Sequence, residues 1–273
     1  MSPSRLFAPV WRFLLLAALG TPAASAGEIV LYDNTAGNLP QDQQWLTYIG
    51  VASVSSPADG VTVDTRAFDL LAAGYFNHSL NATPDDWSLK DPAFPSLDPS
   101  LGFTLGFELQ ILDEDHVSSD RAGFSVILLG QDLLGIELGF WEGEIWAQSG
   151  PSFTHAEGAP YNTTLERVLY ELTIVGTSYF LRADGNQLLT GATRDYSPAT
   201  PNPDPYGTPN MLFLGDDTGS AGADVTLGRI TLATGPFAAP APAPWLLLTG
   251  GLLWLARRRT AWSGCRLARC SSG

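Results

Sequence analysis

The sequence predicts an all-β protein, a single antiparallel β-sandwich over residues 27–235. The first observation is that short runs of alternating apolar and polar residues recur along this stretch, as in strands that bury one face. The second is that no amphipathic helical pattern of useful length interrupts these runs. The stretch has 209 residues, which is a normal length for one sandwich domain.

The clearest strand is expected at residues 102–112. Phe103, Leu105 and Phe107 point to one face while Thr104 and Gly106 point to the other, so one face is predicted to pack on a second sheet. Further strands are expected, in chain order, at 122–129, 136–140, 145–148, 168–174, 179–182, 212–214 and 225–232. Residues 176–177 and 184–186 have turn composition, and the proline-rich stretches 84–99 and 198–209 are predicted to be long loops.

The charge of the chain is unevenly distributed. Of its 14 basic residues, two precede the first apolar run and five follow the last one, whereas all 28 acidic residues lie between. The middle segment therefore carries a formal charge of −21. Such an acidic surface repels phosphate backbones, so nucleic acid is excluded as a partner.

Residues 1–26 have the composition of a secretion signal. Arg5 and Arg12 precede a short apolar run, and small residues at 24 and 26 form a cleavage site for signal peptidase. The run is much shorter than the roughly 20 residues of a spanning helix, so a membrane anchor is the weaker alternative.

The C-terminal end has three parts. A proline motif (Pro240, Pro242, Pro244) is followed by an apolar run at 245–256 and by Arg257, Arg258 and Arg259. Positive charge after a membrane span holds that end in the cytoplasm, so residues 260–273 are predicted to be a cytoplasmic tail. At about 1.5 Å per residue, the run covers only part of a roughly 30 Å bilayer core, which favours a temporary anchor in the inner membrane.

This order of features over residues 236–259 resembles the PEP-CTERM class of bacterial sorting signals. The resemblance implies that an exosortase-like protease cleaves near the proline motif and releases or re-anchors the protein. The chain departs from the class in lacking the glutamate of the motif and in continuing for 14 residues after the arginines. An ordinary tail anchor is the alternative.

The middle segment resembles concanavalin-A-like sandwiches (jelly rolls) of the laminin-G and glucanase type, chiefly in the hairpin 170–186 and in residues 213–230. It also resembles the choice-of-anchor extracellular domains, most closely type Y, in residues 31–34, 120–126, 137–142 and 214–218. These resemblances imply a fold and a location at the cell surface. They imply no activity, because fold alone does not give function.

Pairing residues 136–140 with 145–148 as a hairpin yields one candidate ligand-binding patch. With a two-residue loop at 142–143, one face of the hairpin presents two indoles, two carboxylates and an amide around Gly139. These groups, which suit stacking and hydrogen bonding to a sugar of an extracellular polysaccharide, are Glu137, Trp141, Glu144, Trp146 and Gln148. The commoner alternative is that the indoles are structural and cover a second layer of loops.

A catalytic role is not predicted. Glucanases of this fold pair carboxylates on one strand in the pattern Glu-x-Asp-x-x-Glu, and here Gly139 replaces the helper aspartate. Glu137 and Glu142 are five residues apart, so a regular strand directs them to opposite faces, away from the about 5–5.5 Å of a retaining pair. The spacing of these glutamates therefore predicts that the protein is not an enzyme.

The only cofactor considered is Ca²⁺. Asp113, Asp115 and Asp120 lie in a predicted acidic turn after a strong strand and offer hard oxygen ligands. Their spacing differs from that of an EF-hand, and a solvated acidic turn is the commoner alternative.

Together these features predict an exported protein of the cell surface or extracellular matrix, with a structural or glycan-binding role. The alternatives are a diverged glycoside hydrolase of the concanavalin-A-like fold and a Ca²⁺-dependent adhesin.

The two terminal signals predict proteolytic processing at both ends. The mature protein should lack residues 1–26 and the segment from the proline motif onward, because signal peptidase and an exosortase-like protease remove them. Intact-mass analysis of the exported protein tests this. A steady-state envelope species that retains residues 245–273 would indicate a permanent anchor instead.

Overall fold

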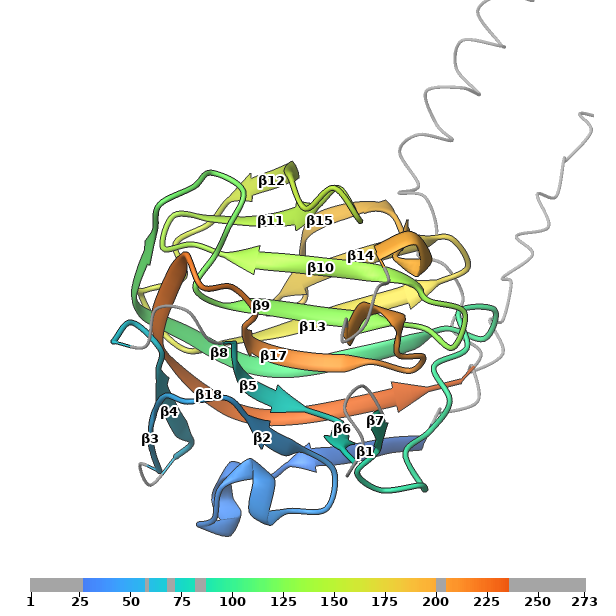
Figure 1. Cartoon of the computed structure of the whole chain (residues 1–273), viewed down its shortest axis with the longest axis horizontal. Coiled ribbons are helices and arrows are strands. Elements are labelled where there is room, and N and C mark those ends of the chain that lie inside the picture. The colour runs from blue at the N-terminus through green and yellow to red at the C-terminus, as the bar shows by residue number, and fades with distance from the viewer. Residues whose placement is uncertain (1–26, 57–58, 68–71, 82–86, 200–204, 236–273) are drawn as a thin grey trace, which may run out of the picture.

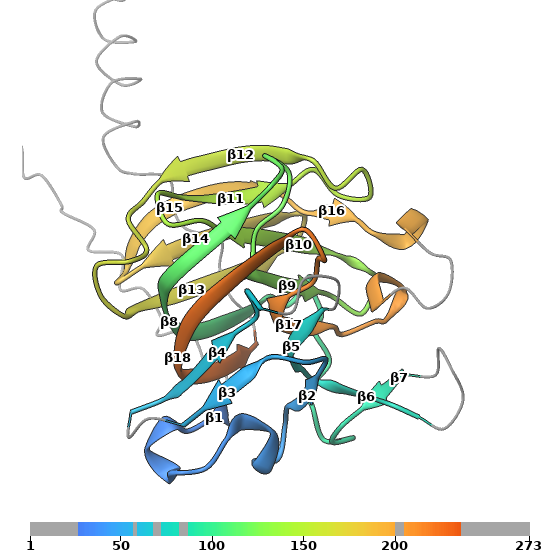
Figure 2. The ribbon, with the colours of Figure 1, turned by 60° about the vertical axis from the view of Figure 1, so that its left-hand side comes forward.

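The computed structural model describes residues 27–56, 59–67, 72–81, 87–199 and 205–235. These residues form two eight-stranded sheets and one separate two-stranded hairpin, and every strand pair is antiparallel. Figures 1 and 2 show the sheets stacked as two layers. The prediction of an all-β antiparallel sandwich is confirmed. The predicted signal peptide and sorting segment lie outside the described residues, and no described helix is long and apolar enough to span a bilayer.

Sheet A has the strand order β15–β14–β13–β8–β18–β4–β3, and β1 pairs with the part of β18 that β4 leaves free. Its strands are β1 (Gly27–Tyr32), β3 (Ser53–Ser55), β4 (Val61–Asp64), β8 (Phe103–His116), β13 (Val168–Val175), β14 (Ser178–Ala183), β15 (Asn186–Ala192) and β18 (Ala221–Thr234).

Sheet B has the order β12–β11–β10–β9–β17–β5–β2, and β16 pairs with β10. Its strands are β2 (Thr47–Ile49), β5 (Ala73–Phe76), β9 (Ser125–Leu129), β10 (Leu134–Phe140), β11 (Glu144–Gln148), β12 (His155–Pro160), β16 (Arg194–Asp195) and β17 (Leu212–Asp216). The remaining elements are the hairpin of β6 (His78–Leu80) and β7 (Trp87–Leu89) and four 3₁₀ turns, η1 (Asn34–Ala36), η2 (Pro40–Asp42), η3 (Ser197–Ala199) and η4 (Pro205–Gly207).

The strands that alternate most clearly in sequence occupy the centre of sheet A. Phe103, Leu105 and Phe107 are fully buried between the sheets, whereas Thr104 is half-buried on the outer face. The strand is longer than predicted, because β8 continues through His116. The predicted acidic turn at 113–116 is therefore wrong: these residues pair with Ala221 to Asp224 of β18, which satisfies their backbone groups.

The predicted hairpin at 136–148 is confirmed together with its register. Gly139 lies opposite Trp146, and Phe140 lies opposite Ile145. The Trp141 amide donates to the Glu144 carbonyl at 2.9 Å, which closes the two-residue loop. A second tight turn, between β14 and β15, has Asp184 (φ 46°) and Gly185 (φ 78°) in left-handed conformations, as hairpins with the right-handed strand twist require.

The main core fills the space between the two sheets, and a second apolar cluster covers the outer face of sheet B. Phe76, Ile127 and Phe213 project outward from β5, β9 and β17. Tyr196 and Tyr206, from the segments around η3 and η4, pack over them. The β7 strand, which lies within a stretch predicted to be loop, adds Trp87 to this layer. The outer face of sheet B is thus largely filled, whereas among the described residues no such layer covers the outer face of sheet A.

Candidate functional site

Three of the five residues of the predicted hairpin patch are buried. Trp146 and Glu137 are each 1% exposed and Gln148 is 3% exposed. They occupy the predicted face of the hairpin, but this is the face covered by the side chains of Tyr196, Tyr206 and His155. Whether the patch binds a ligand stays a prediction.

The indole of Trp146 occupies the gap at Gly139, where the patch was expected to leave room for a sugar. A Cβ at position 139 would lie 2.6 Å from an indole carbon of Trp146. The ring also contacts His155, with centroids 4.5 Å apart, and Trp141 at 5.5 Å. The indole therefore packs as a core side chain, as the alternative in the sequence analysis has it.

Trp141 and Glu144 are half-buried and line an open surface hollow of about 330 Å³, together with Glu114 and His116. The Trp141 indole stacks on the His116 ring at 4.3 Å and donates its N–H to the Arg121 carbonyl at 2.7 Å. Glu144 approaches the His155 Nε2 at 3.4 Å. The five predicted residues are thus divided between a buried network and this hollow.

Glu137 has a carboxylate partner that the sequence analysis did not identify. Glu142 lies exposed in the hairpin turn, whereas Glu137 is buried, so these two glutamates form no pair. Glu137 instead shares the hydroxyl of Tyr206 with Asp217: the hydroxyl lies 2.5 Å from the Glu137 Oε2 and 2.9 Å from the Asp217 Oδ2. The amide of Gln148 donates to the Glu137 Oε1 at 2.5 Å.

These short contacts require a shared proton. A tyrosine hydroxyl has one proton to donate, so it cannot donate to two carboxylates at once. Burial raises the pKa of Glu137 well above its ordinary value, and the nearby charge of Asp217 adds to the shift. Burial also raises the pKa of Asp217, against hydrogen bonds that lower it. At least one of the two carboxyls is therefore protonated under conditions in which exposed carboxyls are ionised.

The three aspartates of the predicted Ca²⁺ site are not brought together. Asp113 forms an ion pair with Arg66, whose guanidinium also binds Asp64 at 2.9 Å. Asp120 accepts the backbone N–H of His155 at 2.8 Å, and Asp115 is exposed on β8. Within the described ranges, no three His, Cys, Asp or Glu side chains are arranged to hold a metal ion.

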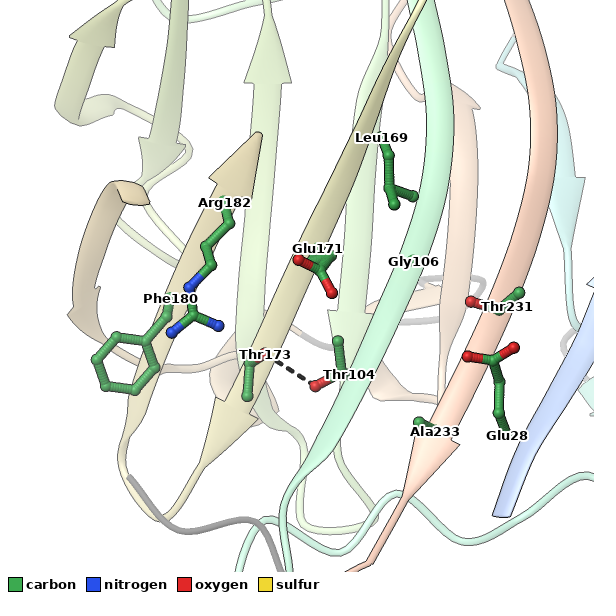
Figure 3. Close-up of a pocket in the computed structure, with 10 residues that line it drawn as sticks. All are labelled: Glu28, Thr104, Gly106, Leu169, Glu171, Thr173, Phe180, Arg182, Thr231 and Ala233. Atoms are coloured by element: carbon green, nitrogen blue, oxygen red, sulfur yellow. Dashed lines mark hydrogen bonds between the residues drawn. The ribbon is translucent and has the colours of Figure 1, made fainter. Parts of the chain in front are cut away.

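The outer face of sheet A has an open groove of about 370 Å³ (Figure 3). Its described lining residues come from five adjacent strands and form two rows across the sheet. One row consists of Arg182, Glu171, Gly106 and Thr231, and the other of Phe180, Thr173, Thr104, Ala233 and Glu28. Leu169 completes the lining.

The middle of the groove is hollow because Gly106 has no side chain. A Cβ at this position would lie 2.7 Å from the Thr231 Oγ1. The hydroxyls of Thr104 and Thr173 are hydrogen-bonded to each other at 2.8 Å on the groove floor. Each hydroxyl has two lone pairs and one proton, so this pair retains acceptor capacity toward the groove.

Two charged side chains stand next to each other in the groove without pairing. Glu171 lies opposite Arg182 in the register of β13 and β14, and both are half-buried. Within the described part of the chain, neither side chain forms a salt bridge or a hydrogen bond. The groove therefore offers a carboxylate, a guanidinium and hydroxyls within one hollow, with the Phe180 ring at its end (Figure 3).

The sequence pattern does not reveal this groove, although it predicts four of the five strands that build it; β1 was not predicted. The outward positions of 102–112 and 168–174 were visible as the polar half of the alternation. Their neighbours across the sheet, Glu28 and Thr231, are distant in sequence, so only the strand order brings them beside Gly106.

Comparisons with known proteins give similarity of fold. No family model and no curated protein matches the chain. Among solved structures, a carbohydrate esterase from the Shiga toxin-encoding bacteriophage phi24B is 13% identical, with a TM-score of 0.47 over 77% of this chain and 100% of that one. The Crh5 transglycosylase in complex with NAG is 12% identical, with a TM-score of 0.46 over 80% and 86%. A Bacillus subtilis protein of unknown function with a galectin-like fold is 10% identical, with a TM-score of 0.46 over 78% and 99%.

These neighbours correct one expectation. The prediction that the protein is not an enzyme, made from the spacing of Glu137 and Glu142, is contradicted: the similar solved structures include a carbohydrate esterase and a transglycosylase. A Trypanosoma rangeli sialidase is also similar over 69% of this chain and 27% of that one, at 16% identity and a TM-score of 0.39.

The packing of Trp146 predicts a large effect on stability. Trp146→Ala should lower the free energy of unfolding by about 3–5 kcal/mol, as truncation of buried aromatics does. Trp141→Ala should cost less, because that ring is half-buried. Urea titration of the purified chain and both variants measures this. An unchanged midpoint for Trp146→Ala would contradict a core role.

The carboxyl pair of Glu137 and Asp217 predicts a specific pH dependence. A carboxyl whose pKa is raised by folding binds its proton more tightly in the native state, so its own contribution to stability is fully present below the pKa of the unfolded chain and is lost as the pH rises through the raised pKa. The slope approaches about 1.4 kcal/mol per pH unit for one proton. Glu137→Gln should reduce this slope, whereas the exposed Glu166→Gln should not. Urea unfolding at several pH values between 4.5 and 8 compares the three chains, and parallel curves would refute the assignment.

Proposed function

We propose that the sandwich domain binds carbohydrate and that the groove on the outer face of sheet A is its binding site. The observation that carries this proposal is that Glu171 and Arg182, which form no salt bridge or hydrogen bond within the described part of the chain, lie beside a hydroxyl-lined hollow. Sugars present many hydroxyls that both donate and accept, so a site for them needs donors and acceptors held in fixed positions. Five adjacent strands of sheet A supply this rigidity, since the backbone of each lining residue is fixed by its ladder.

The aromatic ring at one end of the groove supports the same function. Phe180 is half-buried on β14, next to Thr173 across the ladder. An aromatic face exposed beside polar groups suits the apolar C–H face of a pyranose ring. The volume of about 370 Å³ lies in the usual range for small-ligand sites, and the groove is open enough to admit a chain end or a branch.

The proposed setting of this function is extracellular. We infer a concanavalin-A-like sandwich that is exported by residues 1–26 and carried by the sorting segment 236–259 to the cell surface or matrix. The acidic composition of the middle segment and the motif order at the C-terminal end support this proposal. The ligand expected there is an extracellular polysaccharide.

A second candidate function is glycoside hydrolysis at the same groove. Figure 3 shows Glu171 and Glu28 on either side of Thr104, Gly106 and Thr231. Three strand spacings of about 4.8 Å, about 14 Å in all, separate their backbones, which is too wide for a retaining pair. Only if both side chains lean toward each other across the groove would the two carboxyls approach the roughly 6.5–9.5 Å of an inverting pair with a water between. One carboxyl would protonate the glycosidic oxygen as its bond to the anomeric carbon breaks. The other would take the proton of the water that attacks that carbon.

The binding proposal predicts a loss of affinity without a loss of stability. Arg182→Met keeps the aliphatic stem but removes the donors, and Glu171→Gln removes the charge. Each should weaken glycan binding about 10- to 150-fold, the range for hydrogen bonds to charged groups. A glycan array followed by calorimetry on the bound sugars measures this, with Glu166→Gln as the charge-matched control. Unchanged affinity in both groove variants would place binding elsewhere.

The hydrolase candidate makes a separate prediction. If the groove cleaves its glycan, the wild-type chain should release reducing ends with inverted anomeric configuration, and Glu171→Gln should abolish the release. NMR of the freshly formed product reads the configuration. Binding without any release of reducing ends would leave carbohydrate binding as the function and eliminate hydrolysis.

A further inference from the structure

Another cavity lies on the outer face of sheet B, on the side of the sandwich opposite the groove, within the apolar cluster that covers this sheet. It measures about 270 Å³ and is nearly all apolar. Its described lining residues come from β2, β5, β7, β9, β17, η4 and the adjoining loops: Ile49, Ala72, Phe76, Trp87, Ile127, Tyr206, Met211, Phe213 and Asp217. We call it the aromatic pocket. None of these residues belongs to the groove of sheet A.

Four aromatic rings from four different elements line the aromatic pocket. The ring centroids of Phe76 and Trp87 are 5.1 Å apart, with an interplanar angle of 71°. Those of Phe76 and Phe213 are 6.4 Å apart, with an angle of 75°. Near-perpendicular rings of this kind form the corner of a box. Tyr206 contributes the fourth ring and is itself held by stacking on Tyr196 at 5.2 Å.

The charge in this pocket is negative. Asp217 is the one charged residue among the described lining residues, and Glu137 lies behind it on the shared Tyr206 hydroxyl. The His78 ring lies beside the Phe76 ring, with centroids 5.1 Å apart. It adds no competing positive charge near neutral pH, because burial lowers the pKa of His78 to about 4. The surrounding domain carries a large net negative charge.

We propose that the aromatic pocket binds a small organic ammonium ion, with the cation held against the aromatic faces and beside the Asp217 carboxyl. Aromatic faces attract cations through the ring quadrupole, and the attraction increases where water is excluded. A carboxylate at the end of the box adds direct charge pairing. An anion would be repelled, and a neutral sugar would find too few polar partners in a lining this apolar.

Ligand binding is coupled to the proton that Glu137 and Asp217 share. A bound cation favours the fully ionised pair, so binding should release up to one proton. The titratable and charged groups around the pair are Tyr206, Tyr196, Arg121 and Arg194, and both tyrosine pKa values are raised by burial, so neither tyrosine ionises near neutral pH. The affinity should therefore fall as the medium is acidified, by up to about tenfold per pH unit below the apparent pKa of the pair.

The test compares a cation with its neutral twin. Choline and 3,3-dimethylbutan-1-ol have the same shape and differ in the charge of the central atom. Calorimetry on the purified full chain at pH 7.5 should detect choline and should show binding of the alcohol that is weaker by tenfold or more. Equal binding of the two compounds, or no binding of choline, overturns the proposal.

Single substitutions test whether choline binds in the aromatic pocket. Asp217→Asn preserves shape and should weaken choline binding at least tenfold, whereas the exposed Glu166→Gln removes the same charge and should leave it unchanged. Trp87→Leu should weaken it about 2- to 30-fold, the range of one cation–π contact. If Asp217→Asn fails to fold, the pH dependence of the wild-type chain still tests the proposal. A choline affinity that stays constant or rises as the pH is lowered from 7.5 to 5 contradicts it. Arg182→Met should retain choline binding, which separates this pocket from the carbohydrate groove.

Discussion

The pairing of β8 with β18 determines where the other elements of the domain can lie. Both strands have 14 residues, and their ladder extends from Phe103 opposite Thr234 to His116 opposite Ala221. On one side β8 carries β13, β14 and β15, and on the other side β18 divides its edge between β4 and β1. Because register shifts interrupt the ladder twice, the two strands bend, and the sheet they centre is curved rather than flat.

This ladder also explains why the two outer faces of the sandwich differ. Sheet A is built from long strands joined by tight turns, as between β13 and β14 and between β14 and β15. Sheet B is built from shorter strands, and the segments around η3 and η4, between β16 and β17, fold back over its outer face and supply Tyr196 and Tyr206. One face is consequently an open, polar surface, and the other encloses buried carboxyls and an aromatic pocket.

The sequence predicted a feature only where the residues that form it lie close together along the chain. The alternation at 103–111 and the register that places Gly139 opposite Trp146 are local, so a period of two and a short turn sufficed to predict them. Glu137 and Asp217 are 80 positions apart in the chain, and no rule of residue spacing predicts that their carboxyls meet on the Tyr206 hydroxyl. The groove around Gly106 depends on the order of five strands, which a pattern of polar residues does not specify.

The prediction of a turn at 113–116 failed for a related reason. A run of acidic residues is usually solvated, but here Arg66 neutralises Asp113 and the backbone remains in the ladder with β18. Likewise, the aromatic face of the hairpin was correctly placed by its register. That register could not show that Trp146 would be packed beneath His155 and against Gly139.

The position of β1 has a mechanical consequence. Gly27 lies directly opposite Thr234, so the first and last described strands end side by side. The chain therefore enters and leaves the domain at one point, and a domain held there would hang from a single attachment rather than being stretched between two. Glu28 and Ala233, which line the groove, lie next to that point. Traction on the C-terminal end would thus load β18 along its own length, as shear along its ladder with β8 and along the shorter ladders with β1 and β4, and would not peel it from an edge. Joining the two ends and opening the chain at an exposed turn such as 184–185 would preserve the described strand pairings of the sandwich.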